Sequence, residues 1–197
     1  NLDWNLKGFR HEKSLETENQ YSYYYYKADD EVEYLNPNDD EVASDIDWVA
    51  YKQHFFSSIL SSKTPFNDAT LKSVDFEGKE KDTVFTKTYG FKAPLALTNG
   101  ELNYDMEWFY GPTNYNLLKT YEGTNLDEIA DLGWGLFGFL NRTVFYPVFN
   151  MLKGFMGNFG LIIILMTIVV RIIMSPVLYK SYLSSAKMKV IRPELTA

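Results

Sequence analysis

The clearest pattern of apolar and polar positions lies near the end of the sequence. Phe159–Val170 is apolar except for Gly160 and Thr167, and a shorter apolar run resumes after Arg171. Together the two runs are about 20 residues long, which is the length that a helix needs to cross the hydrocarbon core of a membrane. The pattern therefore predicts a membrane-spanning helix, which we place at residues 157–182.

Basic residues follow the apolar runs directly. Between the end of the apolar runs and Glu194 there is no acidic residue, but there are four basic ones: Lys180, Lys187, Lys189 and Arg192. Because Lys and Arg are enriched beside a span on its cytoplasmic side, the chain is predicted to run through the span from outside to inside. Residues 183–197 are then the start of a cytoplasmic helical region.

A charged residue lies inside the predicted span. Arg171 is roughly 18 Å along the helix from Phe159 and roughly 14 Å from Lys180. An isolated charge at such a depth costs at least about 2.5 kcal/mol. On a helix it shares one polar stripe with Thr167, Ser175 and Tyr182. Two interpretations stay open from the pattern: the stripe faces protein or water, or Arg171 extends to the cytoplasmic interface from a simple anchor helix.

An aromatic-rich segment, residues 131–156, precedes the predicted span. Trp134 and Phe137 are among its large apolar side chains, and its polar positions gather on one helical face: Arg142, Tyr146, Asn150 and Lys153. Such a helix is typical of the membrane interface, where it lies in the plane of the bilayer. The alternative is a short second span, but two antiparallel spans would leave the preceding acidic residues in the cytoplasm. We therefore expect an interfacial amphipathic helix, followed by a bend at Gly154–Gly160.

Residues 1–130 predict an antiparallel β-sandwich, because short β-rich runs alternate with turn signals. The predicted strands are Leu2–Phe9, Tyr21–Tyr26, Val32–Leu35, Trp48–Leu60, Thr70–Glu77, Asp82–Phe91 and Glu101–Tyr110, with the second and third paired as a hairpin. The predicted loops are Asn36–Asp47 and Ser61–Asp68, and short helices follow with caps at Thr113 and at Thr124 or Asn125. The chain as a whole is predicted to be an α+β membrane protein fragment.

The charge divides the chain at the same place. Residues 1–130 hold 12 Lys and Arg against 24 Asp and Glu, a balance of −12, whereas residues 131–197 hold 7 against 2, a balance of +5. This fits an extracytoplasmic domain joined to a membrane segment and argues against a nucleic-acid binder, which needs a concentrated basic surface. The absence of Cys excludes thiol chemistry, disulfides and cysteine metal sites. Residue 1 is Asn and no export signal precedes the acidic part, so we expect a piece of a longer protein.

Candidate catalytic groups are few. Asp105 and Glu107 share one face of a predicted strand, and paired carboxylates perform glycoside hydrolysis, but the solvated side of an edge strand explains them better. His54 has no second His nearby and His11 is remote in sequence, so we expect a hydrogen-bonded His in the core or a cleft rather than a metal site. The sequence holds no GxSxG, P-loop, HExxH or dinucleotide motif. We expect no enzymatic activity and no cofactor.

Several motifs in one order resemble the YidC-type membrane protein insertases. In the apolar region they are the turn Gly157–Gly160, Thr167 and Arg171 in a Thr-x-x-x-Arg pattern, Pro176, Lys180, the triplet Ala186, Lys187 and Met188, and Pro193. In the acidic part they are WVAYKQHFF at Trp48–Phe56 and YGPTNY at Tyr110–Tyr115. The resemblance covers most of the chain from Trp48 onward.

The resemblance implies the second half of a periplasmic β-supersandwich, an interfacial helix and the second of six transmembrane helices, in a multi-pass protein of the bacterial inner membrane. It implies insertion and folding of nascent membrane proteins, alone or with the Sec translocon, with the ribosome and the lipid bilayer as further partners. The site it implies is a hydrophilic groove that contains Arg171 beside Thr167 and Ser175, although the ring of the tyrosine often found at position 175 is missing. The alternative is a membrane-tethered periplasmic sugar-binding or scaffold domain, in which Arg171 is structural.

Overall fold

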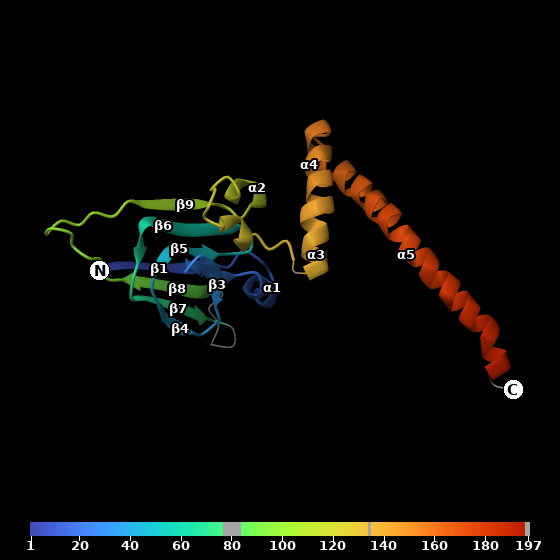
Figure 1. Cartoon of the computed structure of the whole chain (residues 1–197), viewed down its shortest axis with the longest axis horizontal. Helices are drawn as coiled ribbons and strands as arrows, with labels where there is room; N and C mark the ends of the chain where they lie inside the picture. The colour runs from blue at the N-terminus through green and yellow to red at the C-terminus, as the bar shows by residue number, and fades with distance from the viewer. Residues whose placement is uncertain (77–83, 134, 196–197) are drawn as a thin grey trace. The chain divides into compact units, whose positions relative to one another are not determined.

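The computed structural model describes residues 1–76, 84–133 and 135–195, and for residues 177 and 189–195 it describes the backbone alone. The chain divides into two compact units, Asn1–Asp131 and Leu132–Ala197 (Figure 1). The first unit consists of two antiparallel β-sheets, and the second is helical. The predicted antiparallel β-sandwich and the predicted combination of sandwich and apolar helix are confirmed.

The two sheets contain four and five strands. In order across the first sheet, the strands are β1 (Leu2–Phe9), β8 (Phe85–Ala93), β7 (Ala69–Asp75) and β4 (Asp40–Ala43). In order across the second sheet, they are β3 (Glu31–Leu35), β2 (Tyr23–Ala28), β5 (Ile46–Lys52), β6 (Phe56–Phe66) and β9 (Met106–Pro112). The predicted hairpin exists as the antiparallel pair β2 and β3.

The edges of the two sheets face one another in pairs. On one side, the Tyr26 hydroxyl donates to the carboxylates of Glu33 on β3, at 2.6 Å, and Glu41 on β4, at 3.1 Å. On the other side, the ring of Trp4 on β1 packs edge-on against Trp108 on β9, with centroids 4.7 Å apart. The sandwich is thus closed by hydrogen bonds at one pair of edges and by indole rings at the other.

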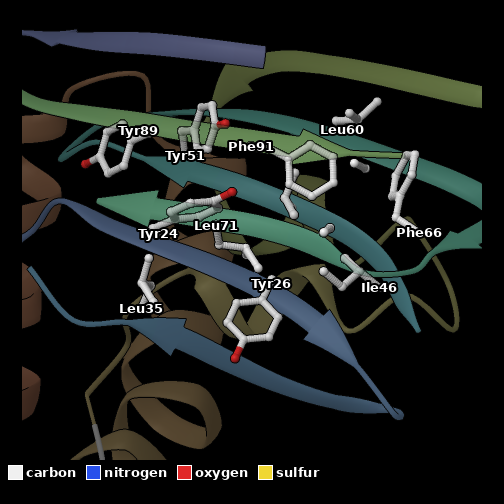
Figure 2. Packing of buried hydrophobic residues seen from close by; sticks show 13 residues of the cluster. Tyr24, Tyr26, Leu35, Ile46, Tyr51, Leu60, Phe66, Leu71, Tyr89 and Phe91 are labelled. Carbon is white, nitrogen blue, oxygen red and sulfur yellow. The ribbon is translucent and has the colours of Figure 1, made fainter. Parts of the chain in front are cut away.

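An aromatic core fills the space between the sheets (Figure 2). Tyr51 stacks on Tyr89, with centroids 5.1 Å apart, and meets Tyr24 edge-on at 4.8 Å. The Tyr51 hydroxyl donates to the carbonyl of Trp4 at 2.8 Å, so this buried polar group is satisfied. Burial raises the pKa of Tyr24, Tyr51 and Tyr89, because an ionised phenol would lose its hydration there.

A second layer covers the outer face of the five-stranded sheet. The short helix α2 (Tyr115–Leu118) and the 3-10 turn η1 (Leu126–Ile129) bury Leu118 and Ile129 against Trp48 and Ala50. The Trp48 indole donates to the carbonyl of Thr124 at 2.7 Å. Strand β5 is therefore buried on both of its faces.

This double burial explains the main error in the predicted strands. Trp48–Leu60 is not one strand, because β5 ends at Lys52 and β6 begins at Phe56. The turn between them contains neither Gly nor Pro and is closed by the Gln53 amide, which donates to the carbonyl of Phe56 at 2.8 Å. With apolar side chains on both faces, β5 has no alternation that would have marked its end.

Other boundaries also differ from the prediction. The predicted loop Asn36–Asp47 contains β4, and most of the predicted loop Ser61–Asp68 belongs to β6. The last predicted strand begins later, at Met106, and the ends of the two strands before it fall partly in residues 77–83, outside the described residues. Helix α2 is capped by the side chain of Asn114, not Thr113, because the Asn114 amide oxygen accepts from Leu117.

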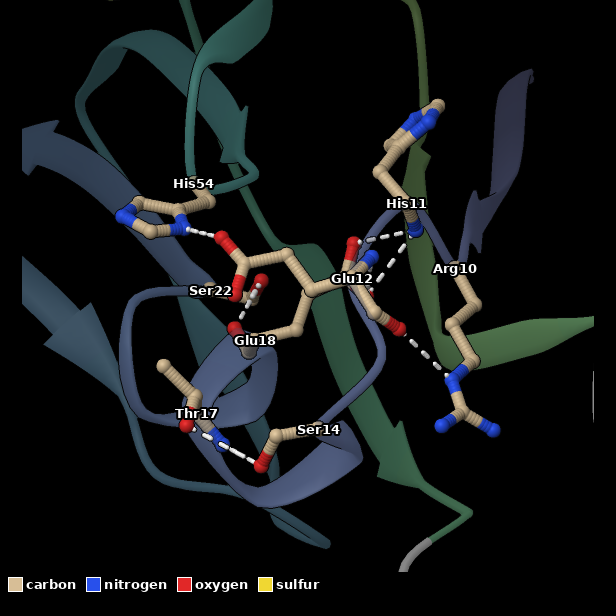
Figure 3. A network of polar contacts seen from close by, with 8 residues as sticks. All are labelled: Arg10, His11, Glu12, Ser14, Thr17, Glu18, Ser22 and His54. Carbon is tan, nitrogen blue, oxygen red and sulfur yellow. Dashed lines mark hydrogen bonds and ion pairs between the residues drawn. The ribbon is translucent and has the colours of Figure 1, made fainter.

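A short helix that the sequence did not predict lies between β1 and β2. Helix α1 (Leu15–Gln20) is capped by Ser14, whose hydroxyl accepts from the Thr17 amide. The buried carboxylate of Glu18 accepts from the backbone amides of His11, at 2.9 Å, and Glu12, at 3.1 Å (Figure 3). A polar segment therefore folds because one carboxylate binds the loop that precedes it.

The second unit consists of helical segments in sequence. Helix α3 (Gly135–Leu140) passes through a π-helical turn, η2 (Asn141–Phe145), into α4 (Tyr146–Phe155). The helix then breaks at residues 156–158 and resumes as α5 (Phe159–Leu195), a helix of 37 residues. The side chain of Asn158 caps α5, because its amide oxygen accepts from the backbone of Gly160 at 2.9 Å. Helix α5 continues through Pro176 and past residue 182 without interruption.

The aromatic core allows a test of its hydrogen bonding. Tyr51→Phe should lower the free energy of unfolding by about 1 kcal/mol, because the carbonyl of Trp4 loses its buried donor. Tyr51→Ala should cost about 3–5 kcal/mol, because it also leaves a cavity. Denaturant unfolding of the full chain, followed by tryptophan fluorescence, measures both. Leu97→Ala, at a side chain that is 66% exposed, is the control and should change little. Equal effects of the three changes would contradict this description of the core.

Candidate functional site

The candidate site is a hollow along one face of α5. Its lining residues are Ile168, Arg171, Ile172, Ser175, Pro176 and Tyr179. Arg171, Ser175 and Tyr179 follow one another at intervals of four residues, so they form one row along the helix. Of the residues predicted on this stripe, Thr167 and Tyr182 do not line the hollow. Tyr179 was not predicted, although its spacing from Arg171 was already a signal.

The charged group in this row has no partner among the residues that the structure describes. Arg171 is exposed, and among the described residues no side chain forms a hydrogen bond or an ion pair with it. The Thr167 hydroxyl donates to the carbonyl of Ile163 at 2.8 Å, so its proton is bound within the helix and its oxygen can accept from other groups. The row therefore offers an unpaired cation, with hydroxyl groups of Ser175 and Tyr179 beside it.

The first part of this helix, Phe159–Pro176, is apolar on most of its remaining surface. Within the described part of the chain, one helix is long and apolar enough to cross a membrane, and its window Phe159–Pro176 has a mean hydropathy of 2.3. Ile162 is buried, whereas large side chains around the helix are exposed, among them Ile163, Ile164, Ile172 and Met174. An exposed apolar surface of this extent marks a site of interaction with lipid or protein.

The segment before α5 also exposes large apolar side chains. Phe137 and Phe139 on α3 and Phe155 on α4 are each more than 60% exposed. Of the residues predicted for an interfacial helix, Arg142 and Lys153 are exposed and Tyr146 is half-buried, whereas Trp134 lies outside the described residues.

The π-helical turn at η2 includes Arg142 and begins at Asn141, whose side chain donates to the carbonyl of Leu132 at 2.7 Å. This bond holds the start of the helical unit in place. Among the predicted basic residues beyond the span, Lys180 and Lys187 are exposed on α5. The side chains of Lys189 and Arg192 lie outside the described residues.

The two candidate carboxylates in the sandwich have different surroundings. Asp105 forms an ion pair with Lys63, which raises the pKa of the lysine. Glu107 lies on β9, an edge strand, and is exposed. Both residues line an open cleft beside Trp48 and Thr124. This arrangement agrees with the expected solvated side of an edge strand.

His54 lies in the turn between β5 and β6. One ring nitrogen contacts a carboxylate, and the ring stacks with two aromatic side chains. Its Nδ1 is 2.5 Å from a carboxylate oxygen of Glu12 (Figure 3). Its ring stacks on Tyr21, with centroids 4.5 Å apart, and on Phe55, at 4.1 Å. Within the described ranges, no group of three or more His, Cys, Asp or Glu side chains could hold a metal ion.

Asp131, the last residue of the first unit, lies beside the adjacent ends of β2 and β5. Burial raises the pKa of Tyr25 to about 12, and the negative charge of Asp131 adds to the effect. Burial also lowers the pKa of Lys52, an effect that Asp131 partly offsets. The Lys52 ammonium lies 5.5 Å from the ring centre of Tyr23. The chain therefore leaves the sandwich at the end where β5 finishes.

Two family profiles match the sequence. The profile of the YidC periplasmic domain matches residues 8–147, and that of the 60Kd inner membrane protein matches residues 151–197. The chain belongs to the YidC family. The resemblance noted from the sequence is thereby confirmed.

Curated YidC relatives match almost the whole chain. One relative is the protein of Parabacteroides distasonis that is named membrane protein insertase YidC. The alignment covers 98% of the chain, and 33% of the aligned residues are identical. The proteins of the same name from Porphyromonas gingivalis and Bacteroides fragilis are 32% and 29% identical over the same share. The chain spans about a third of the length of these relatives, 32% in each case. The family names indicate an inner membrane protein with a periplasmic domain.

The position of Asp131 gives a prediction. Asp131→Asn should lower the pKa of Tyr25 from about 12 toward its ordinary value of 10.0, because a repelling charge is removed. Ring-carbon NMR of labelled tyrosine, titrated between pH 9 and 12, measures the shift. The free energy of unfolding should follow: the stabilisation from Tyr25 is complete below its unfolded pKa of about 10 and is lost as the pH rises through about 12.

Asp105→Asn is the matched control, because this carboxylate lies by Lys63. It should leave the Tyr25 titration unchanged. An unchanged titration in Asp131→Asn would contradict the placement of Asp131 beside Tyr25.

Proposed function

We propose that this chain is part of a membrane protein insertase and supplies the cation of its insertion groove. The observation that carries the proposal is Arg171, an exposed guanidinium without a partner among the described residues, within the apolar part of α5, Phe159–Pro176. Membership in the YidC family and the names of its relatives support it. The span at residues 157–182 and the groove residues Arg171, Ser175 and Thr167 belong to this proposal.

The mechanism that we propose is electrostatic. In a wet groove surrounded by lipid and protein, the attraction between Arg171 and an acidic group is stronger than in bulk water, because the effective dielectric constant is lower. An acidic or polar extracytoplasmic segment of a nascent membrane protein is drawn partway across the bilayer. Its apolar segment then moves sideways into lipid, favoured by about 25 cal/mol for each Å² of apolar surface removed from water.

The segments on either side of the groove have supporting roles. Residues 131–156 lie in the membrane interface, with Phe137 toward the acyl chains and Arg142, Tyr146 and Lys153 toward headgroups. The basic residues of the cytoplasmic region, from 183 on, and Lys180 contact lipid headgroups or receive the substrate. The Sec translocon, the ribosome and further membrane helices are the partners in a multi-pass inner membrane protein. No enzymatic reaction and no cofactor take part.

The charge of Arg171 gives the main test. In the full-length protein, expressed in a strain depleted of its own insertase, Arg171→Lys should retain insertion and Arg171→Glu should abolish it. For substrates with an acidic extracytoplasmic tail, we expect a loss of about tenfold or more, which corresponds to about 1.4 kcal/mol. The fraction of substrate inserted is measured by protease protection.

Lys153→Glu makes the same charge reversal on α4, outside the groove, and should have a much smaller effect. If Arg171→Glu inserts acidic substrates as well as the parent, the electrostatic role is wrong. The chain would then fit the alternative, a tether for a sugar-binding or scaffold domain.

The carboxylates of the sandwich provide a second test. Changing both Asp105 and Glu107 to Ala should leave insertion nearly unchanged, because the first is paired with Lys63 and the second faces solvent. The same depletion assay measures this. A loss of insertion comparable to that of Arg171→Glu would show that this face of the sandwich takes part in the process.

A further inference from the structure

An exposed aromatic turn lies at the end of the sandwich where the chain leaves it. The turn joins β5 to β6, and its Phe55 and Phe56 are 57% and 56% exposed. Its backbone is fixed to the end of β9, because the Thr113 amide donates to the carbonyl of Phe55 at 2.8 Å. More than half of each ring stays in contact with water, which is unfavourable for an apolar group, so the two rings indicate a surface that meets an apolar phase.

The ring of Phe55 is supported by a stack. Tyr21, His54 and Phe55 lie face to face in that order, at centroid distances of 4.5 and 4.1 Å. His54 is in turn held by Glu12 at 2.5 Å. The polar groups behind the rings are thus paired within the fold, including the carboxylate of Glu18 with its backbone amides (Figure 3). This surface can approach an apolar phase without burying an unpaired carboxylate of Glu12 or Glu18.

Chain connectivity restricts what this surface can meet. Phe55 is three residues from Lys52, whose pKa responds to Asp131 at the exit of the first unit. Helix α3 begins at Gly135, four residues after Asp131, and four extended residues reach at most roughly 14 Å. The opposite end of the sandwich holds the N-terminus (Figure 1), and β8 ends beside it because Ala93 pairs with Leu2, so Leu97 follows four residues after that end. The aromatic turn is therefore at the end of the sandwich from which the chain continues, within four residues, into the segment that we assign to the membrane interface.

We propose that the β5–β6 turn contacts the lipid surface, with Phe55 and Phe56 inserted among the headgroups of the outer leaflet. This proposal rests on the membrane assignment of residues 131–182 made above. Aromatic side chains are enriched at the boundary between headgroups and acyl chains. The contact holds the sandwich at a fixed height over the bilayer at two points, the chain exit and the turn.

The sequence contains no Cys, so a single introduced cysteine carries the only spin label. The full chain is reconstituted in vesicles of phosphatidylethanolamine and phosphatidylglycerol, with a nitroxide at Phe55→Cys. Collision with oxygen, which concentrates in lipid, is compared with collision with a water-soluble nickel complex. Leu97→Cys, exposed at the opposite end of the sandwich, is the matched control, and Ile163→Cys reports on the span itself.

We expect the oxygen-to-nickel ratio at position 55 to lie well above that at position 97 and to approach that at position 163. The ratio should not change with salt, because the contact is apolar and is not screened. A ratio at position 55 equal to that at 97, or poor access of both reagents, which indicates a covering protein surface, overturns the proposal, as does loss of the contact at high salt.

Position 163 separates this proposal from the proposed function. Lipid access at 163 with water access at 55 overturns the lipid contact alone, whereas water access at 163 overturns the membrane assignment on which it rests. If Phe55→Cys changes the circular dichroism of the chain, the label is placed at Phe56→Cys, which retains Phe55 and the stack, and the same outcomes apply.

Discussion

The burial of strand β5 on both faces is the constraint on which the first unit depends. On its inner face Tyr51 stacks on Tyr89 in the core, and on its outer face Trp48 is covered by α2 and η1. The layer formed by η1 also fixes the place where the chain leaves the sandwich, because Ile129 is fully buried two residues before Asp131. Packing in the sandwich therefore determines where the membrane unit is attached.

Helix α5 follows the opposite rule. Its apolar side chains are exposed, and Arg171 has no hydrogen-bond or ion-pair partner among the described residues. Contact with water would therefore not stabilise the apolar surface of α5. A lipid phase stabilises the apolar surface but opposes the charge of Arg171, which needs water, protein or substrate beside it. The proposed insertion groove would meet both demands, because it would place a boundary between lipid and a wet cavity along this helix.

The sequence predicted the strongly patterned parts correctly and failed where the pattern was absent. The strand Leu2–Phe9, although its signal was weak, and the apolar helix from Phe159 were both predicted, because their apolar positions follow one period or one long run. The division of Trp48–Leu60 was missed because a strand buried on both faces does not alternate. Helix α1 was missed because it is short and polar; its local signal, the Ser14 cap, has no apolar period beside it, and the bonds from Glu18 to the preceding loop cannot be read from a period.

In the candidate site, Arg171 and Ser175 lie together as the helical period predicted, and Tyr179 completes their row. The π-helical turn before Tyr146 could not be predicted from a period of 3.6 residues, because such a turn has a different period by definition. The roles of all these residues stay predictions that need the full-length protein.

The break between α4 and α5 has a mechanical consequence. Residues 156–158 separate the helices α4 and α5. The side chain of Asn158 accepts hydrogen bonds from the first backbone amides of α5. With α5 across the membrane and α4 in its interface, as proposed above, such a joint would let α5 change its tilt as the bilayer thickens or thins while α4 keeps its depth. A difference in bilayer thickness would then change the backbone only at residues 156–158, and neither α4 nor α5 would unwind.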